Sequence, residues 1–160
     1  MFAVLDTVER SVFDGIFSAL DAASRPIVGS ADPRLLVIPI RNRAGAVTGG
    51  LWGTTLFRWF EIEMLVVPPD MRQQGIGSAL LAAAEVEAAA RGCIGACVDT
   101  LSFQAGPFYL RRGFTLFGAI DDCPPGHRRL FFRKSLVCPE APGGLSIPKK
   151  RIPGGRDGCA

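Results

Sequence analysis

The sequence is poor in the residues that build metal centres and disulfide frameworks. It has one histidine and five cysteines, and no two cysteines form a Cys-x-x-Cys pair. Because a zinc site needs several closely spaced Cys or His ligands, we expect no metal site. An odd number of cysteines without paired spacing is typical of a reducing compartment, which predicts a cytoplasmic protein.

Long apolar runs and stretches of one charge are also absent. No window reaches the roughly 18 apolar residues of a membrane span. Charged residues interrupt the N-terminal region where a signal peptide would lie, namely Asp6, Glu9, Arg10 and Asp14. The net charge is only +3, and no basic stripe is interleaved with aromatic residues. We therefore expect neither a membrane nor a nucleic acid as a partner.

The composition of the 160-residue chain is that of one globular domain with a well-filled core. Hydrophobic residues make up 48% of it, and eleven of them are phenylalanines. A chain of this length can bury a sizeable core. Residues 138–160 are rich in Pro, Gly and Lys with little to bury. The sequence thus predicts a single domain over residues 1–137, followed by a flexible tail over residues 138–160.

A first helix is predicted over residues 6–24. Asp6 and Glu9 have the spacing of an N-terminal cap, and Pro26 is expected to end the helix. Apolar residues recur at helical spacing and form one face: Val8, Val12, Phe13, Ile16, Phe17 and Leu20.

The rest of the chain predicts an α/β (α+β) fold, in which a mixed central sheet carries helices on its faces. Residues 42–45 read as a hairpin turn, and Gly92 and Gly113 as helix ends. Strands are expected over residues 34–40, 46–57, 58–67, 93–100, 114–120 and 128–136, and helices over residues 75–91 and 107–112. Strict alternation would place Phe60, Ile62, Met64 and Val66 on one face of the strand over residues 58–67, and Glu61, Glu63, Leu65 and Val67 on the other.

The most informative pattern is Arg72-x-x-Gly75-x-Gly77, between that strand and the helix over residues 75–91. Backbone N–H groups of such a turn, together with the free N–H groups and the dipole of the helix, favour a phosphate or pyrophosphate. The pattern is not a P-loop, because no Lys-Ser/Thr pair follows Gly77. It is not the dinucleotide fingerprint either, because the third glycine position is occupied by Leu80. A nucleotide-binding regulator is therefore disfavoured.

Arg-x-x-Gly-x-Gly after a strand resembles the coenzyme-binding signature of the GNAT (general N-acetyltransferase) superfamily. The segment over residues 108–114, Phe-Tyr-Leu-Arg-Arg-Gly-Phe, is similar to a second segment of that family, so the resemblance covers about residues 30–136. Residues 99–105 and 124–127 resemble a bacterial subgroup. Gln73 stands where many family members have glycine, which could tilt the phosphate loop.

This resemblance implies that the strands over residues 58–67 and 93–100, strands 4 and 5 of the family, run parallel and splay apart, with helices on both faces of the sheet. It also implies acetyl-CoA as co-substrate, with its pyrophosphate on the loop N–H groups and its pantetheine along the edge of strand 58–67. The residues expected to bind it are Leu65, Val67, Arg72, Gln73, Gln74, Gly75, Ile76, Gly77, Ser78, Ser102 and Gln104.

The implied reaction needs a base for the amine and benefits from an acid for the departing thiolate. An amine like that of lysine, with a pKa of about 10.4, arrives protonated at neutral pH. The family pattern assigns the acid to Tyr109. Glu63 or Glu61 is expected to act as base through water, with Asp99 and His127 as reserve candidates. Trp52, Asp99 and His127 are candidates to border the acceptor amine.

The resemblance thus implies an N-acetyltransferase that moves an acetyl group from acetyl-CoA to a primary amine by direct attack in a ternary complex. The acceptor is a small molecule or a peptide, and a homodimer is compatible with the family. An alternative stays open because more than one residue is a candidate base: a non-catalytic acyl-CoA-binding sensor or interaction module.

Overall fold

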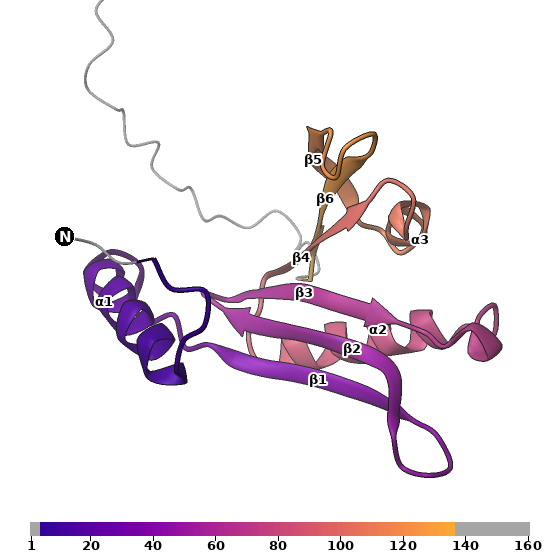
Figure 1. Ribbon diagram of the computed structural model, residues 1–160, viewed down its shortest axis with the longest axis horizontal. Coiled ribbons are helices and arrows are strands. Elements are labelled where there is room, and N and C mark those ends of the chain that lie inside the picture. Colours follow the sequence, from indigo (N-terminus) through magenta and orange to yellow (C-terminus); the bar gives the residue numbers. More distant parts are fainter. Residues whose placement is uncertain (1–3, 137–160) are drawn as a thin grey trace, which may run out of the picture.

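A six-stranded mixed sheet organises the residues that the computed structural model describes, which are 4–136 (Figure 1). The strand order is β1-β2-β3-β4-β6-β5. The tail expected over residues 138–160 lies outside the described residues. The strands are β1 (Arg34–Arg41), β2 (Val47–Leu56), β3 (Trp59–Val66), β4 (Gly95–Leu101), β5 (Thr115–Asp121) and β6 (Arg128–Ser135), and the helices are α1 (Arg10–Val28), α2 (Ile76–Ala90) and α3 (Gly106–Arg111), with a 3-10 turn at Pro69–Met71.

The expected mixed α/β sheet is confirmed. β3 and β4 run parallel, and α2 provides the crossover that a parallel pair requires. All other neighbouring strands are antiparallel. The predicted hairpin turn joins β1 to β2. The side-chain oxygen of Asn42 accepts hydrogen bonds from the backbone N–H groups of Ala44 and Ala46, and Gly45 has φ +81°.

One face of the sheet, called here the helix-covered face, packs against α2 and α3. Phe60 and Ile62 of β3 and Phe132 of β6 meet the buried side of α2 and Tyr109 of α3 there. The buried residues of α2 are Leu80, Leu81, Ala84 and Ala88. This contact fixes where α2 begins, and hence where the loop before it lies relative to β3.

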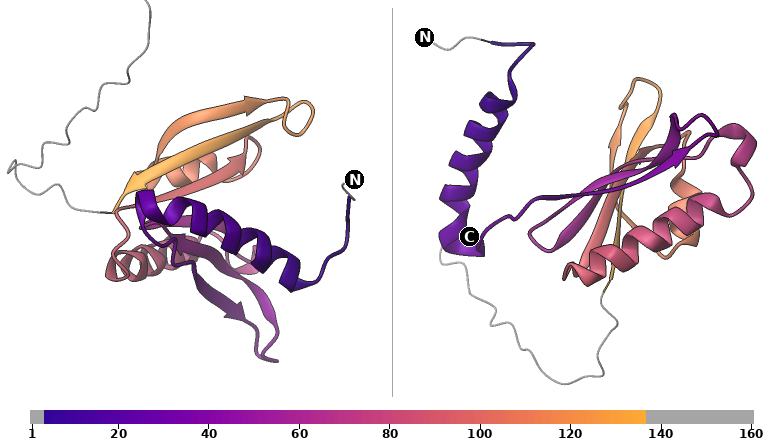
Figure 2. Two further views of the ribbon diagram at one scale, coloured as in Figure 1. Left: turned by 90° about the vertical axis from the view of Figure 1, so that its left-hand side faces the viewer. Right: turned by 90° about the horizontal axis from the view of Figure 1, so that it is seen from below.

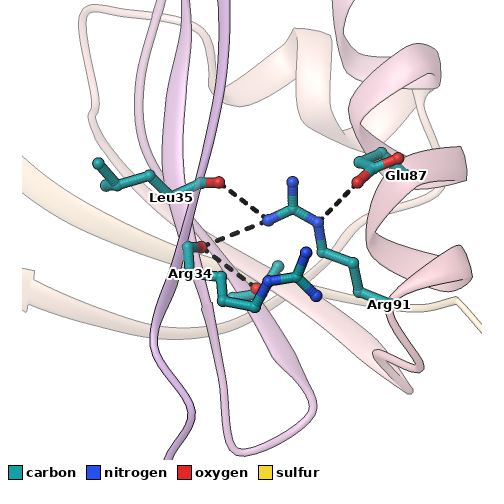
Figure 3. Close-up of polar contacts among 5 residues, drawn as sticks. Arg34, Leu35, Glu87 and Arg91 are labelled. Atoms are coloured by element: carbon teal, nitrogen blue, oxygen red, sulfur yellow. Dashed lines mark hydrogen bonds and ion pairs between the residues drawn. The ribbon is translucent and has the colours of Figure 1, made fainter.

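The far end of α2 is held against the first strand by Arg91 (Figure 3). Its guanidinium donates to the carbonyl of Leu35 at 2.9 Å and pairs with Glu87 at 2.7 Å. Gly92 follows with φ +84°, and the N–H of Cys93 closes the helix on the carbonyl of Ala88 at 3.0 Å. The predicted stop at Gly92 is therefore confirmed.

α1 differs from its prediction at both ends. It begins at Arg10 with Glu9 as N-cap, so Asp6 lies outside it. It also continues through Pro26 to Val28, because a proline in the last turn removes only one backbone hydrogen bond, and Gly29 at φ +81° ends the helix instead. Figures 1 and 2 show α1 beyond the end of the sheet rather than on it.

The opposite face of the sheet, called here the open face, carries Leu35 and Val37 of β1, Trp52 of β2 and Met64 and Val66 of β3. These side chains are exposed to solvent. None of the three helices within residues 4–136 covers them, although the family resemblance implies helices on both faces. No helix among the described residues is long and apolar enough to cross a membrane.

Two leucines test the assignment of the core. Leu81 is 1% exposed in α2, whereas Leu110 is 53% exposed in α3. We expect Leu81→Ala to lower the free energy of unfolding by about 2–5 kcal/mol, because it removes apolar contacts and leaves a cavity. Leu110→Ala, the matched control, should cost less than about 1 kcal/mol. Urea denaturation measures both, and equal losses would contradict the packing of α2 on the sheet.

Candidate active site

The central parallel strands separate halfway along their length. β3 and β4 pair only from Trp59 with Gly95 to Ile62 with Val98. Beyond that point β4 stays paired with β6 as far as Leu101, and β3 stays paired with β2 as far as Val66. The edge of β3 over residues 63–66 therefore turns unpaired backbone groups toward the gap. The splay expected between these strands is present.

An irregularity in β3 changes which side chains face the gap. The pairing of β2 with β3 shifts register next to Trp52, where Trp52 is opposite Met64 but Gly53 is opposite Ile62. Such a bulge inserts one residue and reverses the alternation beyond it. Glu61 and Glu63 therefore share the open face with Met64 and Val66, whereas Leu65 and Val67 pack toward the core. The prediction that Leu65 and Val67 share a face with the two glutamates was wrong.

A cavity of about 870 Å³ occupies the gap. It is bounded by the end of β3, the loop before α2, the end of β4 and the start and end of α3. Most of the sequence-predicted residues line it: Glu63, Leu65, Val67, Arg72, Gln73, Gly75, Ile76, Gly77, Ser78, Asp99, Gln104 and Tyr109. Five others do not: Glu61, Gln74, Ser102, Trp52 and His127.

The loop at the start of α2 has the backbone form of an anion cradle. Gly75 is its N-cap in the left-handed region, at φ +80°, and no side chain caps the helix. The first N–H to bond within the helix is that of Ala79, to the carbonyl of Gly75. The N–H groups of Ile76, Gly77 and Ser78 precede it, so they and the positive end of the helix dipole face the cavity mouth.

Side chains around this loop brace it. The guanidinium Nε of Arg72 donates to the carbonyl of Val67 at 3.0 Å, and the amide of Gln74 donates to the carbonyl of Asp70 at 3.0 Å. Gln73 adopts φ +61°, a conformation that a glycine would take at no cost. A Cβ on Gly77 would meet the Cγ2 of Val67 at 3.4 Å, so the helix start and the strand end already touch.

Tyr109 enters the cavity from the helix-covered face. It is buried among the rings of Phe108, Phe114 and Phe132. Burial, with a smaller contribution from the negative charge of Asp99, raises the pKa of Tyr109 to about 12. The phenol therefore keeps its proton across the neutral range.

Among the carboxylates, Glu63 is the one on β3 that borders the cavity. Its Oε1 accepts a hydrogen bond from the hydroxyl of Thr54 at 2.8 Å, which holds it on the open face. Glu61 lies on the part of β3 that is still paired with β4, opposite Cys97. Burial first, and then the charges of Glu61 and Asp99, raise the pKa of Cys97 to about 11.

Asp99 borders the cavity but is already engaged. Its Oδ2 lies 2.6 Å from the guanidinium of Arg129 on β6. That hydrogen bond, together with the carboxylate charge, raises the pKa of Arg129. The ion pair joins the end of β4 to β6, so the side chain of Asp99 is directed toward Arg129.

The remaining candidates sit at the rim or outside it. The side-chain oxygen of Gln104 accepts from Thr100 and from the N–H of Leu101, while Ser102 accepts from the N–H of Arg128 and so ties the loop to β6. His127 packs edge-on against Phe103, with ring centres 4.6 Å apart.

Sequence reasoning missed several lining residues. Phe103 and Phe108 supply apolar walls, and Arg111 and Arg112 bring two positive charges to the end of α3. The adjacent arginines before the glycine stop were a usable signal. Their position on the same cavity as the loop before α2 was not predictable from the sequence, because it depends on the separation of β3 from β4.

The single tyrosine allows its pKa to be measured directly. We expect ultraviolet titration of phenolate to give a transition near pH 12 in the folded protein and near pH 10 in denaturant. Because the folded value is the higher one, the free energy of unfolding should fall as pH rises from about 10 to about 12. Tyr109→Phe should abolish the transition. A folded-state value near 10 would contradict the burial of Tyr109.

Comparisons with known proteins agree with this geometry. The model of the acetyltransferase (GNAT) family matches residues 10–114. An acetyltransferase of Agrobacterium fabrum is 39% identical over 133 residues, which cover 83% of this chain and 97% of the relative. The blasticidin-S acetyltransferase of Streptomyces morookaense is 43% identical over 119 residues, covering 73% and 88%.

A crystal structure of an Agrobacterium tumefaciens protein assigned as an acetyltransferase superposes with a TM-score of 0.76 at 38% identity, covering 84% of this chain and 98% of that one. The family match spans more than half of the chain and agrees with the splayed strands and the loop at the start of α2. The chain belongs to the GNAT family of acetyltransferases.

Proposed function

We propose that the protein transfers the acetyl group of acetyl-CoA to a primary amine by direct attack within a ternary complex. One observation carries the proposal. The unpaired edge of β3 and the free N–H groups at the start of α2 border the same cavity. This juxtaposition offers one cofactor both a strand-like partner for its amide arm and a positive cradle for its diphosphate.

The residues present fit such a cofactor. Gly75 and Gly77 let a diphosphate approach the backbone closely, because neither position carries a Cβ. Leu65 lies near the end of β3 and Val67 directly follows it, on the stretch where the pantetheine amides would pair. Arg111 and Arg112 add positive charge at the same mouth for the remaining phosphate. The volume of about 870 Å³ is within the range of small-molecule sites, about 300–1,000 Å³.

When bound, acetyl-CoA supplies an activated acetyl thioester. The protein has to manage two protons. Glu63 accepts the proton of the amine, directly or through a water, from the open face. Tyr109 holds a proton on its Oη at neutral pH and supplies it to the departing sulfur, whose thiol pKa of about 8.5 makes this help modest.

The acceptor is a small molecule with a primary amine. The relative named blasticidin-S acetyltransferase, 43% identical, supports this class. Trp52 and Met64 lie opposite each other on the open face next to Glu63, where an acceptor would approach. Phe103 borders the cavity, and His127 packs against it from outside the cavity.

Ser78 offers a direct test of the phosphate cradle. Ser78→Asp puts a carboxylate in the first turn of α2, where it stabilises the helix by about 0.3–1 kcal/mol but competes with an anionic ligand. We expect the affinity for CoA, measured by calorimetry, to fall at least tenfold while the melting temperature is kept. Ser78→Asn, of the same shape without the charge, should bind CoA within about threefold of the parent. Equal affinities for both variants would overturn the cradle.

The two glutamates of β3 provide a matched pair for the base. We expect Glu63→Gln to lower kcat/KM for the amine by about 100-fold with CoA affinity unchanged, because Glu63 borders the cavity and Glu61 does not. Glu61→Gln should change kcat/KM by less than about threefold. Thiol release with a panel of amines that includes blasticidin S measures both. A larger loss in Glu61→Gln would move the base to Glu61.

A further inference from the structure

α1 carries an apolar stripe that none of residues 4–136 covers. Its members, Val12, Phe13, Ile16 and Leu20, recur at helical spacing, and Ile16 and Leu20 are 68% and 64% exposed. Helices of this length owe most of their stability to the packing of such a stripe. Figure 2 shows that α1 stands apart from the sheet along most of its length. The stripe therefore lacks the surface that it is built to contact.

The attachment of α1 explains why it does not reach its own sheet. Its last turns are held at the sheet end by the buried Asp21, whose Oδ1 accepts the N–H of Ala31 at 3.0 Å. Asp21 also pairs with Arg25, and the carbonyl of Ala31 accepts the N–H of Phe57 at 3.0 Å. These bonds fix residues 29–33 and direct the first turns of α1 away from the molecule.

The open face of the sheet also carries apolar side chains that no described helix covers. Leu35, Val37, Trp52, Met64 and Val66 lie exposed on it, Met64 and Val66 by more than half of their surface. These five side chains come from three neighbouring strands and form one apolar patch. Exposed apolar patches of several side chains mark interaction surfaces.

We propose that α1 of a second copy of this chain lies across the open face, and that the two copies exchange helices reciprocally. The dimensions agree: 19 helical residues extend about 28 Å, and strands of 8–10 residues extend about 26–33 Å. A two-fold dimer buries the apolar stripe of α1 and the open face of the sheet in both chains. A different protein on the open face would leave the stripe of α1 exposed.

The buried area is also that of a stable dimer. Each chain offers nine exposed or partly exposed apolar side chains, four on α1 and five on the open face. At roughly 80 Å² for each, about 700 Å² per chain would leave water. A standard protein interface buries about 800 Å² per partner.

The exchange also completes the acceptor side of the active site, a consequence that rests on the proposed function. Glu63, Trp52 and Met64 lie on the open face, so the incoming helix would form a wall of the acceptor site beside Glu63. Covering this face excludes bulk water from the reacting groups. The acetyl-CoA side, on the loop before α2, lies within one chain.

The experiment places a charge in the middle of the stripe. We expect the full-length wild type to sediment as a dimer of the 17.1 kDa chain, and Ile16→Glu as a folded monomer with unchanged near-ultraviolet circular dichroism. Ser18→Glu, about 200° around the helix from Ile16, should remain dimeric. A monomeric wild type, or a dimeric Ile16→Glu variant, would overturn the exchange.

A second variant separates helix-on-sheet exchange from a dimer of α1 with α1. Val37→Glu, on the open face, should also give a monomer, and an equimolar mixture with Ile16→Glu should form heterodimers through the one intact helix–sheet contact. A dimeric Val37→Glu variant would overturn the proposed location.

Activity distinguishes this inference from the proposed function. Ile16→Glu should bind CoA within about twofold of wild type but lose at least tenfold in kcat/KM for the amine. If the dimer forms as described while no amine is acetylated by wild type, the function fails and the exchange stands. Full amine turnover in the Ile16→Glu monomer would overturn the role of the exchanged helix in the site.

Discussion

The separation of β3 from β4 is the constraint on which the site depends. Two parallel strands that part after four paired positions leave an edge of backbone groups without partners inside the sheet. Such groups are costly unless a ligand or water meets them. The two strands are held apart by their other neighbours, because β4 stays paired with β6 and β3 stays paired with β2 beyond the point of separation. The gap is therefore part of the folded structure and does not need a ligand to open it.

The bulge in β3 determines which side chains lie on each side of the gap. By reversing the alternation after Glu63, it turns Leu65 and Val67 toward the core and the Gly77 end of α2, and leaves Met64 and Val66 on the open face. The glutamates and the phosphate loop are thus on opposite sides of one strand. A regular strand with Phe60 and Ile62 on the helix-covered face would have left Leu65 with Glu63 on the open face and turned Met64 toward the core.

How far the sequence predicts this structure depends on the range of each signal. The turn at Asn42, the stop at Gly92 and the loop from Arg72 to Gly77 are local, and each was predicted within a residue or two. The family motif extended this to the splay, to the position of Tyr109 and to membership of the GNAT family. The bulge escaped because it depends on pairing with β2. The end of α1 was misplaced because Gly29, rather than Pro26, stops the helix. The ion pair of Arg129 with Asp99 was not predicted, because the two residues lie 30 positions apart in the sequence.

The gap places the proposed acid and the proposed base on different sides of the sheet. Tyr109 enters from the helix-covered face, within aromatic rings that keep its pKa near 12, while Glu63 stays on the open face beside Thr54. Asp99, at the end of β4, adds to the raised pKa of the phenol, yet Arg129 ties it down. Asp99 thus raises the pKa of the proposed acid, while Glu63 is the proposed base. This division of roles follows from which strand each residue sits on and not from any difference in their chemistry.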